Sequence, residues 1–99
     1  MSNTDLSALR EQIDELDAEL VVLLARRFRI TQKVGLLKAA QGLGAVDSER
    51  EARQEQRLAE LAVRHTVSPA LVASVFRCIV SEVVSNHQSI AQSINGTSR

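Results

Sequence analysis

Hydrophobic residues recur along the first part of the chain at alternating intervals of three and four. They are Leu6, Leu9, Ile13, Leu16, Leu20, Leu23, Ile30, Val34 and Leu37. This spacing places apolar side chains along one seam of a helix, and it predicts a helix over residues 5–41. Thr4 or Asp5 can cap its start, and Gly42 and Gly44 supply its end.

A second helix is predicted where Ser48 and Glu51 stand at the spacing of a capping box. We expect this helix over residues 48–65, after a loop at residues 42–46. Its apolar side is thin, so most of its polar side chains are expected to face solvent.

A third helix is predicted over residues 69–93, because Ser68 and Pro69 suit the N-cap and the first helical position. The polar tail at 94–99 is expected to fray. The sequence has no period-two strand pattern. It therefore predicts a single all-α domain over residues 1–99, with one long, one short and one medium helix.

The first predicted helix is too long to be covered by its own chain. About 36 residues at roughly 1.5 Å per residue give a length of roughly 54 Å, whereas a compact domain of this size has a radius of gyration near ~13 Å. The seam must therefore be covered outside the monomer. We expect a homodimer with the long helices side by side.

Composition excludes several classes of function. The formal net charge is zero, with 12 basic and 12 acidic residues, and aromatic residues make up 2 %. These values argue against nucleic-acid binding through charge or base stacking. No apolar run approaches the roughly 20 residues of a membrane span, and the N-terminus lacks a signal-peptide pattern. The expectation is a soluble cytoplasmic protein with no nucleic-acid or membrane partner.

One seam position carries a charge where the pattern requires an apolar residue. Arg27 occupies it, and a buried guanidinium is costly unless an anion meets it. Lys38 lies about three turns further on nearly the same face, with Val34 between them. Arg10 stands beside the seam roughly 25 Å from Arg27, and in an antiparallel dimer it could approach Arg27 of the other chain.

These cations have two interpretations. Each could pair with Asp or Glu across an interface. Taken together, Arg10, Arg27, Lys38 and Arg50 better predict a site for a small dianion, because guanidinium groups bind carboxylates through two parallel hydrogen bonds.

Other polar residues are candidates for supporting roles. Asp47 and Glu51 share a helix face and serve either as caps or as acceptors for a ligand hydroxyl. His87 interrupts an apolar face, as a core histidine or as a hydrogen-bond donor. His65, His87 and Cys78 do not stand at metal-ligand spacing, so no metal site is expected.

The chain resembles the all-helical, AroQ-type chorismate mutases from Leu6 to about Ile90. The resembling segments are Ala8-Leu9-Arg10-x-x-Ile13-x-x-Leu16-Asp17, Leu23-Leu24-Ala25-x-Arg27, Val34-Gly35-x-x-Lys38 and Asp47-x-x-Arg50-Glu51. The resemblance implies an intertwined homodimer of three-helix chains. It also implies an isomerase of the shikimate pathway that converts chorismate to prephenate for aromatic amino acid biosynthesis, without a cofactor.

The resemblance also implies a role for each cation. Arg10 of the partner chain and Arg27 hold the two carboxylates of the substrate. Lys38 contacts a carboxylate and the ether oxygen, and Arg50 supports the anion site.

The remaining site residues include two departures from the family. By resemblance, Asp47 and Glu51 address the ring hydroxyl. Val83 and His87 stand where enteric members carry Ser and Gln, so the Ser contact is lost and His87 replaces the amide as donor to the ether oxygen. Activity is then expected to depend on pH between about 5 and 8, where histidine titrates.

Three alternatives stay open. An isochorismate–pyruvate lyase shares the fold and the cations, but that family lacks an acid matching Glu51. A 4-amino-4-deoxychorismate mutase would place an amine beside Asp47 and Glu51. The third alternative is a non-catalytic dimeric helical module whose cations are structural or bind a partner.

Overall fold

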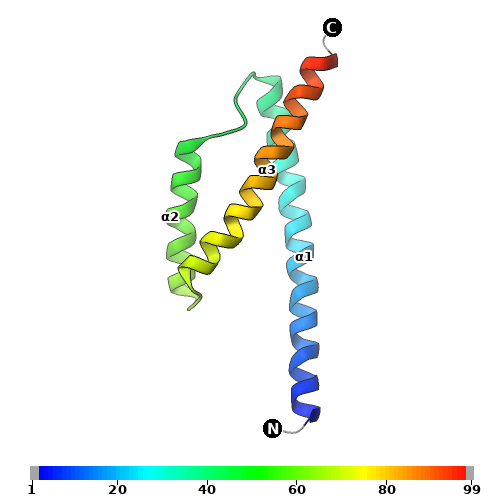
Figure 1. Ribbon diagram of the computed structural model, residues 1–99, viewed down its shortest axis with the longest axis vertical. Coiled ribbons are helices and arrows are strands. Elements are labelled where there is room, and N and C mark those ends of the chain that lie inside the picture. Colours follow the sequence, from blue (N-terminus) through cyan, green and yellow to red (C-terminus); the bar gives the residue numbers. More distant parts are fainter. Residues whose placement is uncertain (1–2, 98–99) are drawn as a thin grey trace. The chain divides into compact units, whose positions relative to one another are not determined.

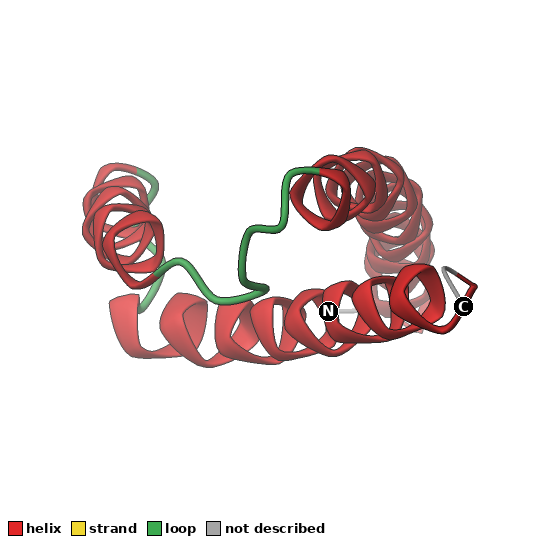
Figure 2. Cartoon of the chain, turned by 90° about the horizontal axis from the view of Figure 1, so that it is seen from above, coloured by secondary structure: helices red, strands yellow, loops and turns green. Residues whose placement is uncertain are grey.

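The computed structural model describes residues 3–97, and these form three helices joined by two loops (Figure 1). The helices are α1 (Asn3–Ala40), α2 (Ser48–Arg64) and α3 (Pro69–Thr97). Figure 2 shows the same described residues as helices and loops without a strand. The predicted all-α fold with one long, one short and one medium helix is confirmed.

The end of α1 follows the predicted glycine signal. Gly42 adopts a left-handed conformation with φ of 69°. The Leu43 N–H donates to the Lys38 carbonyl at 2.8 Å, and the Gly42 N–H donates to the Ala39 carbonyl at 3.2 Å. These two bonds form a Schellman motif, which satisfies carbonyls at the helix end and favours glycine at the left-handed position.

The end of α3 differs from the prediction. The helix was expected to end near Ser93, and it continues to Thr97. No proline interrupts this stretch, and Ile90 and Ile94 keep the i, i+4 apolar spacing of the preceding turns. Of the tail that was expected to fray, residues 98–99 lie outside the described residues.

The chain divides within α1 into two compact units, Met1–Thr31 and Gln32–Arg99. In the first unit the seam residues of α1 are exposed; Leu16, for example, is 61 % exposed. The described part of this unit is a single stretch of helix. This exposed seam leaves a row of apolar side chains of the first unit in contact with water, whereas Leu24 and Phe28 are half-buried.

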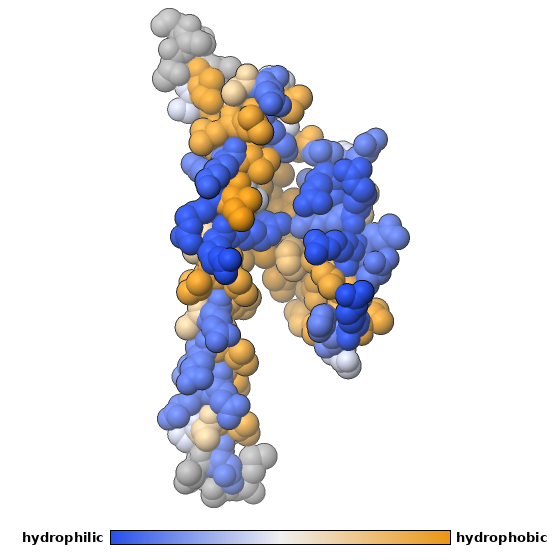
Figure 3. Space-filling view, turned by 180° about the vertical axis from the view of Figure 1, so that it is seen from behind, coloured by the Kyte–Doolittle hydropathy of each residue, from blue (hydrophilic) through white to orange (hydrophobic). Residues whose placement is uncertain are grey.

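The second unit contains the end of α1 together with α2 and α3, and α2 packs against α3. Among the residues whose side chains are described, Ala62 and His87 are buried, and Gly35 is buried with them. On the face drawn in Figure 3, hydrophobic surface lies between hydrophilic stretches. The single chain therefore has only a small core.

By length and composition alone, the segment Pro69–Ile94 of α3 could cross a membrane, with a mean hydropathy of 1.3. Only Arg77 and Glu82 carry charge within this segment, and the expectation of no membrane partner stays a prediction. The apolar helix of a soluble bundle meets the same criterion, and this helix packs against α2.

Candidate active site

Lys38 occupies the last turn of α1, where the negative end of the helix dipole favours a cation. Its side chain is half-buried, and Nζ donates a hydrogen bond to the Ala45 carbonyl at 3.3 Å. Ala45 belongs to the loop between α1 and α2. Lys38 is thus directed toward the loop that leads to Asp47.

Arg27 and Arg10 belong to the first unit, whereas the other predicted site residues belong to the second. Arg27 is half-buried, and its Nη1 atom is shielded from solvent. Arg10 is exposed. The approach of these two guanidinium groups to Lys38 stays a prediction.

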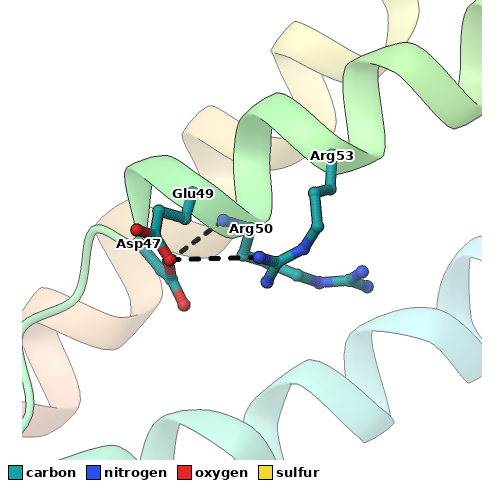
Figure 4. Close-up of polar contacts among 4 residues, drawn as sticks. All are labelled: Asp47, Glu49, Arg50 and Arg53. Atoms are coloured by element: carbon teal, nitrogen blue, oxygen red, sulfur yellow. Dashed lines mark hydrogen bonds and ion pairs between the residues drawn. The ribbon is translucent and has the colours of Figure 1, made fainter.

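The start of α2 is capped by Asp47 and not by Ser48 as the capping-box pattern predicted (Figure 4). Asp47 has extended backbone angles, and its Oδ1 accepts a hydrogen bond from the Arg50 N–H at 3.0 Å. Ser48 is then the first helical residue. Both residue types cap well, so the pattern alone placed the cap one residue too late.

The three predicted polar residues at this helix end differ in exposure. Asp47 and Arg50 are exposed, whereas Glu51 is half-buried. Beside them, Glu49 and Arg53 form an ion pair at 4.0 Å (Figure 4). Because that pair is largely exposed, it contributes little to stability. Glu51 is the acid of this set that the fold partly removes from water.

Glu51 also lines a groove of about 610 Å³ between α2 and α3. Gln54 and Glu55 of α2 and Arg77 and Gln88 of α3 line the same groove. Sequence reasoning singled out Glu51 but missed these other polar residues. Gln54 and Glu55 fall in the stretch of α2 that was expected to be solvated.

His87 is 5 % exposed and faces the end of α1. A Cβ built on Gly35 would lie 3.0 Å from His87 Nε2, so the imidazole edge lies directly against the α1 backbone. Val83, one turn before His87, is half-buried, and Val34, beside Gly35, is 41 % exposed. The sequence indicated that His87 is a core histidine or a hydrogen-bond donor, but it did not identify Gly35 as its neighbour.

The second unit thus combines a half-buried ammonium, a buried imidazole and a half-buried carboxylate. Cations and neutral donors of this kind bind carboxylate or ether oxygens, and a carboxylate accepts from a hydroxyl or an amine. This chemistry suits a small anion that also carries a hydroxyl or an amine.

Comparison with known proteins identifies the family. The sequence profile described as "Chorismate mutase type II" matches residues 9–88. The T-protein of Enterobacter agglomerans is 37 % identical over 78 residues, which cover 79 % of this chain and 21 % of that protein. The bifunctional chorismate mutase/prephenate dehydratase of Escherichia coli (strain K12) is 32 % identical over 91 residues, which cover 92 % of this chain and 24 % of that protein.

A shorter relative is the intracellular chorismate mutase of Mycobacterium tuberculosis (strain CDC 1551 / Oshkosh). It is 35 % identical over 57 residues, which cover 58 % of this chain and 54 % of that protein. The matched segment spans at most about a quarter of the T-protein and of the bifunctional enzyme. The resemblance predicted from the sequence is confirmed, and the chain belongs to the chorismate mutase type II family.

Proposed function

We propose that this chain is a chorismate mutase, an isomerase that rearranges chorismate to prephenate in the cytoplasm, in aromatic amino acid biosynthesis. The observation that carries the proposal is the extent of the family match. All nine predicted site residues, from Arg10 to His87, lie within the matched residues 9–88. The half-buried positions of Arg27 and Lys38 support the proposal, because a solvated helix face would expose both.

The chemistry of the proposed rearrangement explains why a set of fixed cations is enough for catalysis. One C–O bond breaks and one C–C bond forms within a single molecule, so no nucleophile, metal or cofactor takes part. The protein must hold the substrate in the chair-like conformer in which the two reacting carbons are close. Negative charge grows on the ether oxygen as the C–O bond breaks, and a fixed cation there favours the transition state over the ground state.

In this proposal each cation has one task. Arg27 of one chain and Arg10 of the partner bind the two carboxylates, and Arg50 adds positive charge to the anion site. Lys38 binds a carboxylate and the ether oxygen. The Lys38 ammonium has three donors, so its bond to the Ala45 carbonyl leaves two for the substrate.

The other site residues bind the rest of the molecule. Glu51 accepts from the ring hydroxyl, and its half-buried position makes it the stronger candidate than exposed Asp47. His87 donates the second hydrogen bond to the ether oxygen. Val34 and Val83 supply apolar contact beside the ring.

The proposed assembly is a homodimer. Seam residues of α1 are exposed in the single chain, among them Leu9 at 44 %, Ile13 at 54 % and Leu16 at 61 %. An apolar helix seam of this kind is stable when another helix covers it. A second copy of α1 has the matching seam, and its Arg10 then completes the site.

The test is a comparison of substrates. The purified chain is incubated separately with chorismate, isochorismate and 4-amino-4-deoxychorismate, and substrate loss and products are followed by absorbance and chromatography. We expect prephenate from chorismate. Pyruvate released from isochorismate alone would identify a lyase, and turnover of the amino compound alone would identify the amino analogue's mutase. No turnover of any of them would indicate a non-catalytic module.

A further inference from the structure

Gly35 lies inside α1 without a backbone reason to be glycine. Among Gly35, Gly42 and Gly44, only Gly42 adopts a positive φ. A glycine in a helix interior is less favourable than alanine, because it loses more conformational freedom on folding. Its position on a helix therefore calls for another explanation, such as the close approach of a neighbouring group.

That neighbour is the imidazole of His87 on α3. A Cβ at Gly35 would lie 2.5 Å from His87 Cδ2 and 3.0 Å from Nε2, and also 3.0 Å from Ile90 Cδ1. The Ile90 methyl is the end of a flexible chain and can move. The imidazole is a rigid ring on a buried side chain, so even one methyl group at Gly35 displaces the ring or α3 itself.

The same face of α1 carries Lys38, three residues beyond Gly35. The imidazole edge with Nε2 therefore rests on the helix face from which the Lys38 side chain starts. In the proposed function, these two side chains are the donors to the ether oxygen. The absence of a side chain at Gly35 is the feature that allows His87 to lie this close to the helix of Lys38.

We propose that Gly35 is a positioning residue that sets the distance of the His87 imidazole from α1 and thereby aligns the two donors. This inference rests on the proposed mutase function. Gly35 does not touch the substrate; it acts through His87. A displacement of about 1 Å at a reacting group can lower the rate on the order of 100-fold, so the expected effect is large.

The kinetic test compares four variants: Gly35→Ala, Gly44→Ala, His87→Ala and the double variant Gly35→Ala/His87→Ala. Gly44 is the matched control, because a Cβ at this position would have nothing within 4 Å and the φ of Gly44 is not positive. We expect Gly35→Ala to lower kcat by about 10- to 100-fold with a smaller change in KM. Gly44→Ala should stay within about twofold of wild type.

The double variant separates positioning from general packing. If Gly35 acts through the imidazole, Gly35→Ala has no further effect on kcat in the His87→Ala background, within about twofold. An equal loss of kcat in both backgrounds would overturn the proposal, as would wild-type kcat in Gly35→Ala. Should Gly35→Ala fail to fold, thermal unfolding of the double variant decides: folding is restored only if the imidazole is what the new methyl meets.

A measurement made without substrate tests the positioning role of Gly35 separately from the proposed mutase function. The ring signals of the two histidines are followed by NMR, with exposed His65 as the internal reference. Gly35→Ala should shift the His87 signals and leave those of His65 unchanged, and Gly44→Ala should shift neither. If the wild-type chain turns over no substrate, the proposed mutase function is wrong. If the His87 signals are unchanged in Gly35→Ala, the positioning role of Gly35 is wrong, whatever the activity.

Discussion

The Lys38 ammonium, in the last turn of α1, donates a hydrogen bond of 3.3 Å to the carbonyl oxygen of Ala45. Ala45 lies two residues before Asp47, the N-cap of α2. The contact therefore ties the cation that we propose for the ether oxygen to the loop that leads to the acids of α2. It also restricts the lysine before any ligand binds, which reduces the entropy lost on binding.

Replacing Lys38 by alanine should lower kcat on the order of 10²- to 10³-fold, because one fixed donor to a developing oxyanion contributes about that much. The measurement is the steady-state rate with chorismate. Arg26→Ala is the control: Arg26 has the same sign of charge on the same helix but is exposed and outside the predicted site.

Arg26→Ala should stay near the wild-type rate. Because Lys38 also holds the loop, thermal unfolding of both variants must accompany the kinetics. A Lys38→Ala variant with unchanged kcat would remove lysine from the proposed mechanism, whatever its stability.

Asp47 has a capping role that can be separated from a role in binding. Asp47→Ala should lower the free energy of unfolding by about 1 kcal/mol, because the Arg50 N–H loses its acceptor. Asp47→Asn should keep stability near wild type, since asparagine caps as well as aspartate. Urea unfolding measures both.

The kinetics of Asp47→Asn then report on the carboxylate alone. A fall in kcat/KM with stability unchanged would assign Asp47 to the substrate hydroxyl. Wild-type kinetics in Asp47→Asn would restrict Asp47 to the cap and leave Glu51 as the acceptor.

The sequence predicted the helices better than it predicted the contacts between residues far apart in the chain. The 3–4 periodicity of α1 and the glycine stop at Gly42 depend on local rules, and the structure confirms them. The cap at Asp47 was misplaced by one residue, because Asp and Ser satisfy the same local rule. The contact of Gly35 with His87 joins positions far apart in the chain, and no local spacing predicts such a contact.

Helix α2 ends in a Schellman motif, as α1 does. In α2 a threonine occupies the left-handed position, which is a glycine in α1. Thr66 has φ of 58°, and the Val67 N–H donates to the Ala62 carbonyl at 2.9 Å. A β-branched residue in this conformation is strained by roughly 1 kcal/mol or more. Thr66→Gly should therefore raise the free energy of unfolding by about 0.5–1 kcal/mol.

Thr66→Ala is the matched comparison, because alanine keeps a Cβ and so keeps the strain. Its stability should remain near wild type in the same thermal unfolding experiment. A Thr66→Gly variant no more stable than Thr66→Ala would mean that the left-handed conformation at this position is not strained.

If the chain forms the proposed homodimer, a glutamate substitution should affect dimerisation differently at two positions of similar exposure. Leu16 is 61 % exposed and Val63 is 71 % exposed in the single chain. Glutamate at either position should then alter the monomer little. If α1 seams pair between chains, Leu16→Glu buries a charge in the interface and should convert dimer to monomer, whereas Val63→Glu should not.

Light scattering after size-exclusion chromatography measures the mass of each variant. Equal masses for wild type, Leu16→Glu and Val63→Glu would contradict pairing along this seam. A monomeric wild type would remove the homodimer altogether.

The origin of Arg10 is testable by mixing inactive variants. In the proposed site, Arg10 comes from the partner chain and Lys38 from the chain that holds the rest. A heterodimer of Arg10→Ala with Lys38→Ala then has one intact site, built from the Lys38 of the first chain and the Arg10 of the second. Random pairing of equal amounts should restore about a quarter of wild-type activity.

Arg27→Ala mixed with Lys38→Ala is the control for this experiment. Both residues are proposed to act in the site of their own chain, so each site of that heterodimer lacks one cation and activity should not return. Co-refolding with two different affinity tags shows that heterodimers form in both mixtures. If tagged heterodimers of Arg10→Ala and Lys38→Ala remain as inactive as either parent, then Arg10 does not cross the interface, because an intact site would be present in every one of them.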